Sequence, residues 1–234
     1  MNEPSPLQWL PEQGRVEQLM ILLHGVGSEG RALMPLAKRL RAEFPQSAVL
    51  APDGFEPFDM APAGRQWFSV RAVDEANRVA RVAAVLPRLA DWVRAAQQRL
   101  GAGPAATAVV GFSQGAILGL ELAQLHDGLT GRVLAFAGRY ARLPERAPAE
   151  TTLHLFHGAE DEVIPAEQAR LALERLAALH GDATIDIAED VGHELAPVLV
   201  ERALFRLRNH IPYRTWAAAL GTVPGLARRS GEDD

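Results

Sequence analysis

Short runs of apolar residues alternate along this chain with longer stretches in which apolar residues recur at helical spacing. Such alternation is typical of βα units and predicts an α/β fold, with a mostly parallel central sheet and helices on both faces. The apolar runs place the strands at residues 18–23, 48–52, 107–112, 132–137, 152–157 and 184–190. No internal repeat interrupts the pattern, so we expect a single domain over residues 1–234.

The clearest helix is expected over residues 74–100, because the apolar residues there fall on one face. They are Val79, Val82, Leu86, Leu89, Val93 and Leu100. Asp74 and Glu75 stand at the start, where carboxylates favour a helix N-terminus, and Pro87 is expected to kink the helix. Further helices are expected at residues 116–125, 165–179 and 195–208.

Two segments show neither the apolar runs of strands nor the helical spacing of apolar residues. Residues 52–70 mix Pro, Gly and aromatic side chains, and we expect a long ordered loop there. Beyond residue 211 we expect one short helix at residues 216–220 and a disordered tail over residues 225–234.

Charge and composition exclude several classes of protein. The 234 residues carry a formal net charge of −5, and scattered arginines argue against a nucleic-acid-binding surface. Cysteine is absent, so neither a thiolate nucleophile nor a disulfide framework is available. The first residues lack the features of a signal peptide, and no apolar run is long enough to cross a bilayer. We therefore expect no membrane span and a cytoplasmic location.

The stretch GFSQG, residues 111–115, carries the strongest chemical signal, because it joins a predicted strand directly to a predicted helix. This context is typical of a nucleophile elbow, where the chain reverses so sharply that the positions two before and two after the serine must be small. Gly111 and Gly115 supply that clearance. We predict that Ser113 is a nucleophile and that the N–H of Gln114 lies at a helix N-terminus, which favours negative charge. An inert serine in a glycine-rich turn is the alternative.

A serine hydroxyl needs an imidazole to accept its proton, and the chain has seven histidines. His193 lies on a loop between the strand at residues 184–190 and a helix, which places it at the same edge of the sheet as Ser113. His126 and His180 lie near helix ends and His154 lies within a strand, so we expect structural roles for these three.

A catalytic triad also needs a carboxylate. In the chain order that accompanies a nucleophile elbow, the carboxylate lies between the serine and the histidine. The loop after residues 152–157 offers three adjacent acids, Glu160, Asp161 and Glu162. Spacing alone does not choose among them, because adjacent acids are usually a solvated turn.

The stretch LLHGVGSEG, residues 22–30, has two interpretations. Gly25, Gly27 and Gly30 match the spacing of a dinucleotide-binding turn, and Asp53 lies where such a protein places its ribose-binding acid. Alternatively, the same residues form a loop whose N–H groups face an oxyanion. We favour the second interpretation, because it also uses the elbow, the acidic loop and His193.

In this order, the stretches LHGVG, PAGRQWFSV, GFSQGA, HGAEDEVIP and VGHE resemble the phospholipase/carboxylesterase family of the α/β-hydrolases, to which acyl-protein thioesterases belong. The resemblance covers residues 16–212 and implies an α/β-hydrolase fold. It implies Ser113 as the nucleophile, Asp161 as the acid and His193 as the base. It also implies that the N–H groups of Val26 and Gln114 form the oxyanion hole.

Such a site would hydrolyse small carboxylic esters or thioesters through an acyl-enzyme, without a cofactor or metal, and with the small-molecule substrate as its partner. Trp67 and Phe68, together with Phe55 and Phe58, are candidates for one wall of the substrate pocket. Two alternatives are a non-catalytic binding protein of the same fold and an enzyme that transfers the acyl group to an acceptor other than water.

Two positions depart from the family pattern. Ser28 stands where the family commonly has Asp, and it would serve nearly as well if its side chain capped the following helix. Ser69 stands where many relatives have an acid after Trp67 and Phe68, so a contact made by that acid is not expected in this chain.

Overall fold

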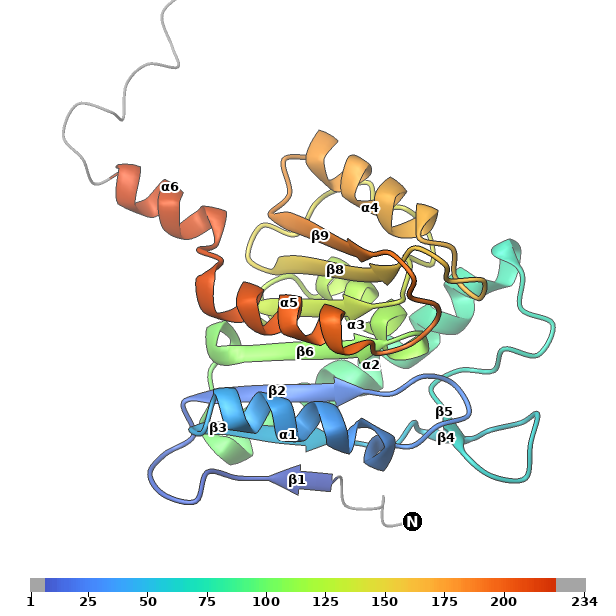
Figure 1. The fold of residues 1–234 in the computed structure, drawn as a ribbon, viewed down its shortest axis with the longest axis horizontal. Coiled ribbons are helices and arrows are strands. Elements are labelled where there is room, and N and C mark those ends of the chain that lie inside the picture. Colours follow the sequence, from blue (N-terminus) through green and yellow to red (C-terminus); the bar gives the residue numbers. More distant parts are fainter. Residues whose placement is uncertain (1–6, 222–234) are drawn as a thin grey trace, which may run out of the picture.

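The computed structural model describes residues 7–221 and is built around a seven-stranded sheet (Figure 1). The strand order is β1-β3-β2-β6-β7-β8-β9, and every pair is parallel except β1 with β3. The strands are β1 (Leu7–Trp9), β2 (Gln18–Leu23), β3 (Ser47–Ala51), β6 (Thr107–Phe112), β7 (Arg132–Phe136), β8 (Thr152–Gly158) and β9 (Ala183–Ala188). The predicted α/β class is confirmed, and each predicted strand is present with ends shifted by at most two residues.

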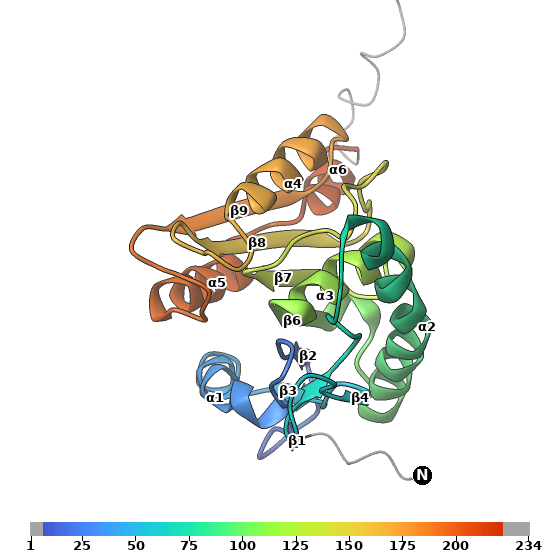
Figure 2. The ribbon, with the colours of Figure 1, turned by 90° about the vertical axis from the view of Figure 1, so that its right-hand side faces the viewer.

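Helices cover both faces of the sheet (Figure 2). Two of them, α1 (Met34–Glu43) and α5 (Pro197–Asn209), pack on one face. The other face carries α2 (Glu75–Leu100), α3 (Gln114–Leu125) and α4 (Glu167–Ala178). The 3-10 helices η1 (Gly30–Leu33) and η2 (Pro104–Ala106) precede α1 and β6, and α6 (Tyr213–Gly221) follows α5.

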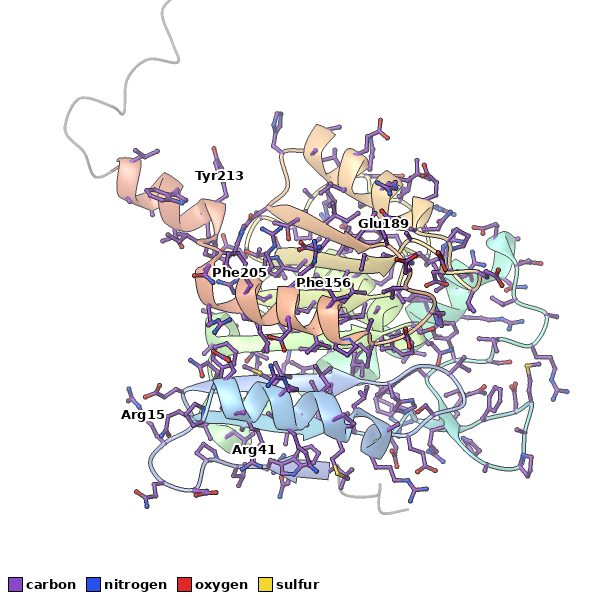
Figure 3. All side chains as sticks on the ribbon, in the orientation of Figure 1. Arg15, Arg41, Phe156, Glu189, Phe205 and Tyr213 are labelled. Atoms are coloured by element: carbon purple, nitrogen blue, oxygen red, sulfur yellow. The ribbon has the colours of Figure 1, made fainter. Side chains whose placement is uncertain are left out.

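Successive side chains along each buried strand point to opposite faces of the sheet and so contribute to the two hydrophobic cores in turn. In β2, Leu19 and Leu23 join the core under α2 and α3, whereas Met20 joins the core under α1 and α5. Phe156 of β8 is fully buried beneath α5, while Phe205 of α5 is exposed (Figure 3). Parallel strands covered on both faces are accordingly apolar on both sides, which is why they read as continuous apolar runs.

The long helix α2 begins and ends where the sequence predicts. Asp74 is its N-cap and accepts the N–H of Asn77 at 2.8 Å, while the Asn77 side chain accepts the N–H of Asp74 at 3.1 Å. The helix continues through Pro87, where a kink was expected, to Leu100. Gly101 follows at a φ of 66° and ends it.

Several elements differ from the expectations. The loop at residues 52–70 contains a short antiparallel pair, β4 (Glu56–Pro57) with β5 (Arg65–Gln66), and the edge strand β1 was not predicted. Strands of two or three residues are too short to show a period, so the sequence pattern misses them. The helix expected at residues 216–220 is part of the longer α6, and the predicted tail at residues 225–234 lies outside the described residues. Within residues 7–221, no helix has the length and apolar character needed to cross a bilayer.

Candidate active site

Ser113 lies at the sharp turn between β6 and α3, at the carboxyl edge of the sheet. Its φ of 53° is a value that residues other than glycine rarely adopt. A Cβ atom at Gly111 would lie 2.3 Å from the carbonyl oxygen of Gly115, and one at Gly115 would lie 2.1 Å from that of Leu23. Packing therefore requires both glycines, and this local geometry is that of a nucleophile elbow.

Asp161 and His193 approach Ser113 from the loops that follow β8 and β9. His193 Nε2 lies 2.9 Å from Ser113 Oγ, and His193 Nδ1 lies 2.7 Å from Asp161 Oδ2. Ser113 and Asp161 are buried, whereas 18% of the His193 side chain is exposed. The three residues predicted from the sequence thus form one hydrogen-bonded chain that is open to solvent at the imidazole.

Burial separates Asp161 from the two acids beside it. Asp161 is 5% exposed, while Glu160 and Glu162 are exposed. Its Oδ1 accepts the N–H of Val163 at 2.9 Å and that of Ile164 at 2.8 Å. These bonds fix the carboxylate so that Oδ2 faces the imidazole, which is the distinction that sequence spacing left open.

The loop after β2 is held by His24, which is fully buried. Its Nδ1 lies 2.7 Å from the carbonyl oxygen of Gly25, and its Nε2 accepts the N–H of Gly54 at 2.8 Å. Because a carbonyl only accepts, Nδ1 carries the proton. Burial lowers the pKa of His24, which keeps the imidazole neutral so that it can donate at one nitrogen and accept at the other. The Trp67 indole N–H donates to the His24 carbonyl at 2.9 Å.

The N–H groups of Val26 and Gln114 are the two predicted oxyanion donors. Among residues 7–221, neither N–H has a hydrogen-bond partner. Gln114 is the first residue of α3, so its N–H stands at a helix N-terminus, where negative charge is favoured. Val26 is half-buried in the loop after β2. A backbone hydrogen bond closes this loop, in which Arg65 donates its N–H to the Ser28 carbonyl at 2.8 Å.

The side chain of Gln114 makes contacts that the sequence did not reveal. Its Oε1 accepts the N–H of Trp67 at 2.8 Å, and its Nε2 donates to the carbonyl of Phe68 at 2.7 Å. The amide is buried, and the backbone of the loop at residues 52–70, which we call the aromatic loop, satisfies both of its polar ends. The elbow and that loop are therefore joined by one residue.

The aromatic residues of this loop differ in their positions. Trp67 and Phe68 are 1% and 5% exposed and pack in the core, so their contact with a substrate stays a prediction. Phe55 packs edge-on against Trp67, with ring centroids 5.2 Å apart. A Cβ atom at Gly27 would lie 3.2 Å from the ring of Phe58. Phe58 therefore lies beside the loop after β2 that carries Val26, which we call the oxyanion loop after its predicted role.

Ser28 does not cap the following helix, so the condition under which it would replace the family's Asp is not met. The N-cap of η1 is Glu29, which makes no side-chain cap bond. The N–H of Gly30 instead donates to Asp53 Oδ1 at 2.7 Å. Asp53 therefore holds the loop to the end of β3, a role unlike that of a ribose-binding acid.

Ser69 and Arg65 stabilise the aromatic loop from within. Ser69 Oγ donates to Asp59 Oδ2 at 2.6 Å, so the serine that replaces the family's acid binds an acid elsewhere in the same loop. Arg65 Nε donates to the carbonyl of Gly54 at 2.9 Å.

The other histidines singled out in the sequence lie away from Ser113. His126 and His180 follow the last turns of α3 and α4. His154 of β8 is buried, with Nδ1 2.8 Å from Thr184 Oγ1 and Nε2 3.2 Å from Arg132 Nη1. Burial, and after it the Arg132 charge, lower the pKa of His154 to about 3.

Comparison with curated proteins shows that this chain is similar to esterases. Residues 10–211 match the model of the family described as phospholipase/carboxylesterase. Esterase YpfH of Escherichia coli (strain K12) is 46% identical over 210 residues, which are 89% of this chain and 90% of that protein. Acyl-protein thioesterase 1 of Gibberella zeae is 27% identical over 126 residues, which are 50% of this chain and 54% of that protein.

Solved structures agree with the sequence comparison. Esterase PE8 superimposes with a TM-score of 0.82 and 29% identity, over 88% of this chain and 99% of its own. The carboxylesterase of Bacillus cereus has a TM-score of 0.71 over 86% of this chain and 91% of its own, and its 17% identity shows the fold alone. The resemblance and the α/β-hydrolase fold are thus confirmed, and the chain belongs to the phospholipase/carboxylesterase family.

Proposed function

We propose that this protein is a serine esterase with Ser113 as nucleophile, His193 as general base and Asp161 as the partner of His193. The observation that carries the proposal is the hydrogen-bonded chain from Ser113 Oγ through His193 to Asp161, at 2.9 and 2.7 Å. Membership of the phospholipase/carboxylesterase family and the similarity to esterase YpfH support a carboxylic ester hydrolase. The cytoplasmic location expected from the sequence stays a prediction.

In the first half of the reaction, Ser113 Oγ attacks the acyl carbon while its proton passes to His193 Nε2. The carbonyl oxygen gains negative charge and accepts the N–H groups of Val26 and Gln114, which have no other partner among residues 7–221. His193 then gives the proton to the leaving alcohol or thiol as its bond to the acyl carbon breaks. An acyl-enzyme on Ser113 remains.

Water reverses the sequence in the second half. His193 accepts a proton from the water that attacks the acyl carbon, and it returns that proton to Ser113 Oγ as the carboxylic acid leaves. Asp161 accepts the Nδ1–H of His193 throughout and stabilises the imidazolium without itself taking the proton.

The substrate class proposed is a small carboxylic ester or thioester. A neutral acyl group suits a site whose donors are backbone N–H groups, and Phe58 over Gly27 offers an apolar surface beside the oxyanion loop. The partial similarity to acyl-protein thioesterase 1 supports thioesters as a second leaving-group class. Acyl transfer to an acceptor other than water would use the same acyl-enzyme and would show as a new ester when alcohols are present.

A fluorophosphonate probe tests the proposal together with a Ser113→Ala variant. We expect the wild-type protein to gain one covalent adduct on Ser113 and to hydrolyse p-nitrophenyl butyrate. Ser113→Ala should abolish labelling and lower kcat by ~10⁴-fold or more, because triad members act as a unit. Ser47→Ala is the matched control, since Ser47 is buried but donates to the carbonyl of Phe44, outside the site.

Three results would overturn the proposal. Full activity in Ser113→Ala would remove the elbow from the mechanism, and a wild-type protein that neither labels nor hydrolyses any ester would favour the non-catalytic binding protein. Saturable micromolar binding of NAD(H) or NADP(H) would favour the dinucleotide turn instead. The bond from the Gly30 N–H to Asp53 argues against that outcome, because the acid is already engaged by its own chain.

A further inference from the structure

A second buried imidazole touches the carboxylate of Asp161. His157 is the last residue but one of β8 and is 1% exposed. Its Nε2 lies 3.2 Å from Asp161 Oδ2, the oxygen that His193 Nδ1 approaches at 2.7 Å from another loop. The same Nε2 lies 2.7 Å from the carbonyl oxygen of Ile164. The reaction described above has no step for this histidine.

The contacts determine how His157 is protonated at Nε2. A carbonyl oxygen only accepts, so Nε2 carries a hydrogen, which it donates to Ile164, and Asp161 Oδ2 at 3.2 Å is a weaker second acceptor. Burial lowers the pKa of His157, so the ring stays neutral against the carboxylate. His157 is therefore a donor of one N–H and brings no charge of its own.

Contacts among His157, Ile164 and Asp161 surround the carboxylate. Ile164 donates its N–H to Asp161 Oδ1 at 2.8 Å and accepts the N–H of His157 at its carbonyl. His157, at the end of a strand that is paired on both sides, thereby holds the loop at residues 161–164 at the point where Asp161 must face His193. A second tie joins the two loops, because Glu160 donates its N–H to the carbonyl of Val191 at 2.9 Å.

We propose that His157 is a positioning residue of the esterase, which fixes the direction of Asp161 Oδ2 and shares its negative charge with the bond to His193. The proposal rests on the proposed function, because it assigns His157 a part in the work of the same triad. It makes the base of the triad depend on a residue that never touches the substrate.

The N–H that His157 directs at the Asp161 carboxylate has a measurable consequence. The charged or titratable groups that face His157 are Asp161 and His193, whereas the neighbouring acids Glu160 and Glu162 are exposed. Without the His157 N–H, more of the negative charge of Asp161 is directed at His193, which favours the imidazolium. The acid limb of kcat/KM, where the base becomes protonated, should then move to higher pH.

The test compares His157→Leu with His157→Gln, whose side-chain N–H can reach Ile164 and Asp161. We expect His157→Leu to lower kcat on p-nitrophenyl butyrate by about 10- to 100-fold, with KM changed less than twofold, because the base is misplaced. Its acid limb should move upward by about 0.5 pH unit. His157→Gln should recover most of the rate and the wild-type limb. Rates are expressed per active site, counted with the fluorophosphonate probe.

His154→Leu is the matched control, because His154 is a fully buried histidine of the same strand without contact to Asp161. It should lose stability but keep the kcat and the acid limb of the wild type. If His157→Leu does not fold, His157→Asn replaces it, since its shorter amide does not reach both acceptors. An unshifted limb with an unchanged rate per labelled site in these variants would reduce His157 to a packing residue. The proposed function would survive that result, because it depends on labelling of Ser113.

Discussion

Two sides of the site meet at Ser113, and they are built in different ways. On the acid–base side, Asp161 and His193 lie on the loops that directly follow the neighbouring strands β8 and β9. Asp161 takes two of its hydrogen bonds from its own loop, at Val163 and Ile164. This side is held by sheet edges and by local turns.

On the oxyanion side, side chains from distant parts of the chain hold the backbone. His24 accepts the N–H of Gly54, and its carbonyl accepts the indole N–H of Trp67. Gln114 reaches from the elbow to Trp67 and Phe68. The difference teaches that the proposed oxyanion donors depend on backbone that the buried side chains of His24 and Gln114 hold in place, and neither side chain belongs to the proposed triad.

Replacing His24 tests that dependence with the largest expected effect. His24→Leu removes the acceptor of the Gly54 N–H and the donor to the Gly25 carbonyl, both in a fully buried place. The loop that carries Val26 should shift, and kcat and kcat/KM should both fall about 100-fold, as for the loss of one oxyanion donor. Steady-state kinetics per fluorophosphonate-labelled site measure the change. Retention of near wild-type kcat would show that the loop holds its shape without His24.

Replacing Gln114 has a smaller expected effect, because the N–H donor belongs to the main chain and survives. Gln114→Ala frees the backbone of Trp67 and Phe68 and should lower kcat about 10-fold. Gln97→Ala is the matched control, since Gln97 is a buried glutamine whose Nε2 binds Thr107 and Leu129 away from the site. Both variants should lose similar stability in urea. An equal loss of kcat in both would assign the effect to general destabilisation.

The acid–base side was largely predictable from the sequence, and its construction explains why. Ser113 and His193 follow strands that the apolar runs located to within two residues, and the carboxyl ends of parallel strands share one edge. Residue spacing therefore carried information about distance in space. The choice of Asp161 among three acids came from the family resemblance, and burial now separates it from its neighbours.

The oxyanion side could be predicted only in outline. A sequence shows that Asp53 lies at the end of a strand, but not that the N–H of Gly30 occupies its carboxylate. It shows Gln114 beside the nucleophile, but not which way the amide reaches across 46 or 47 positions of chain. The sequence left open whether Ser28 caps the following helix for the same reason, since local rules do not include an acceptor such as Asp53 that comes from another part of the chain.

His154 gives the smallest expected effect, on stability alone, and sharpens the comparison between buried histidines that hold the site and one that does not. Its pKa falls from 6.5 to about 3 on burial, with Arg132 as the second cause. Between these pH values the unfolded chain binds a proton that the folded chain refuses, so the free energy of unfolding decreases as pH falls. His154→Leu should be less stable than the wild type at pH 7.5, because Thr184 and Arg132 lose a partner.

The same variant should lose less stability on acidification, by about 3 kcal/mol between pH 7.5 and pH 4.5. Urea unfolding at the two pH values measures the difference, with His180→Gln as an exposed control. Equal acid sensitivity in His154→Leu and the wild type would mean that His154 is protonated in the folded state. A flatter profile with unchanged kcat would separate His154, whose burial only costs acid stability, from His24, whose burial is coupled to the position of the oxyanion loop.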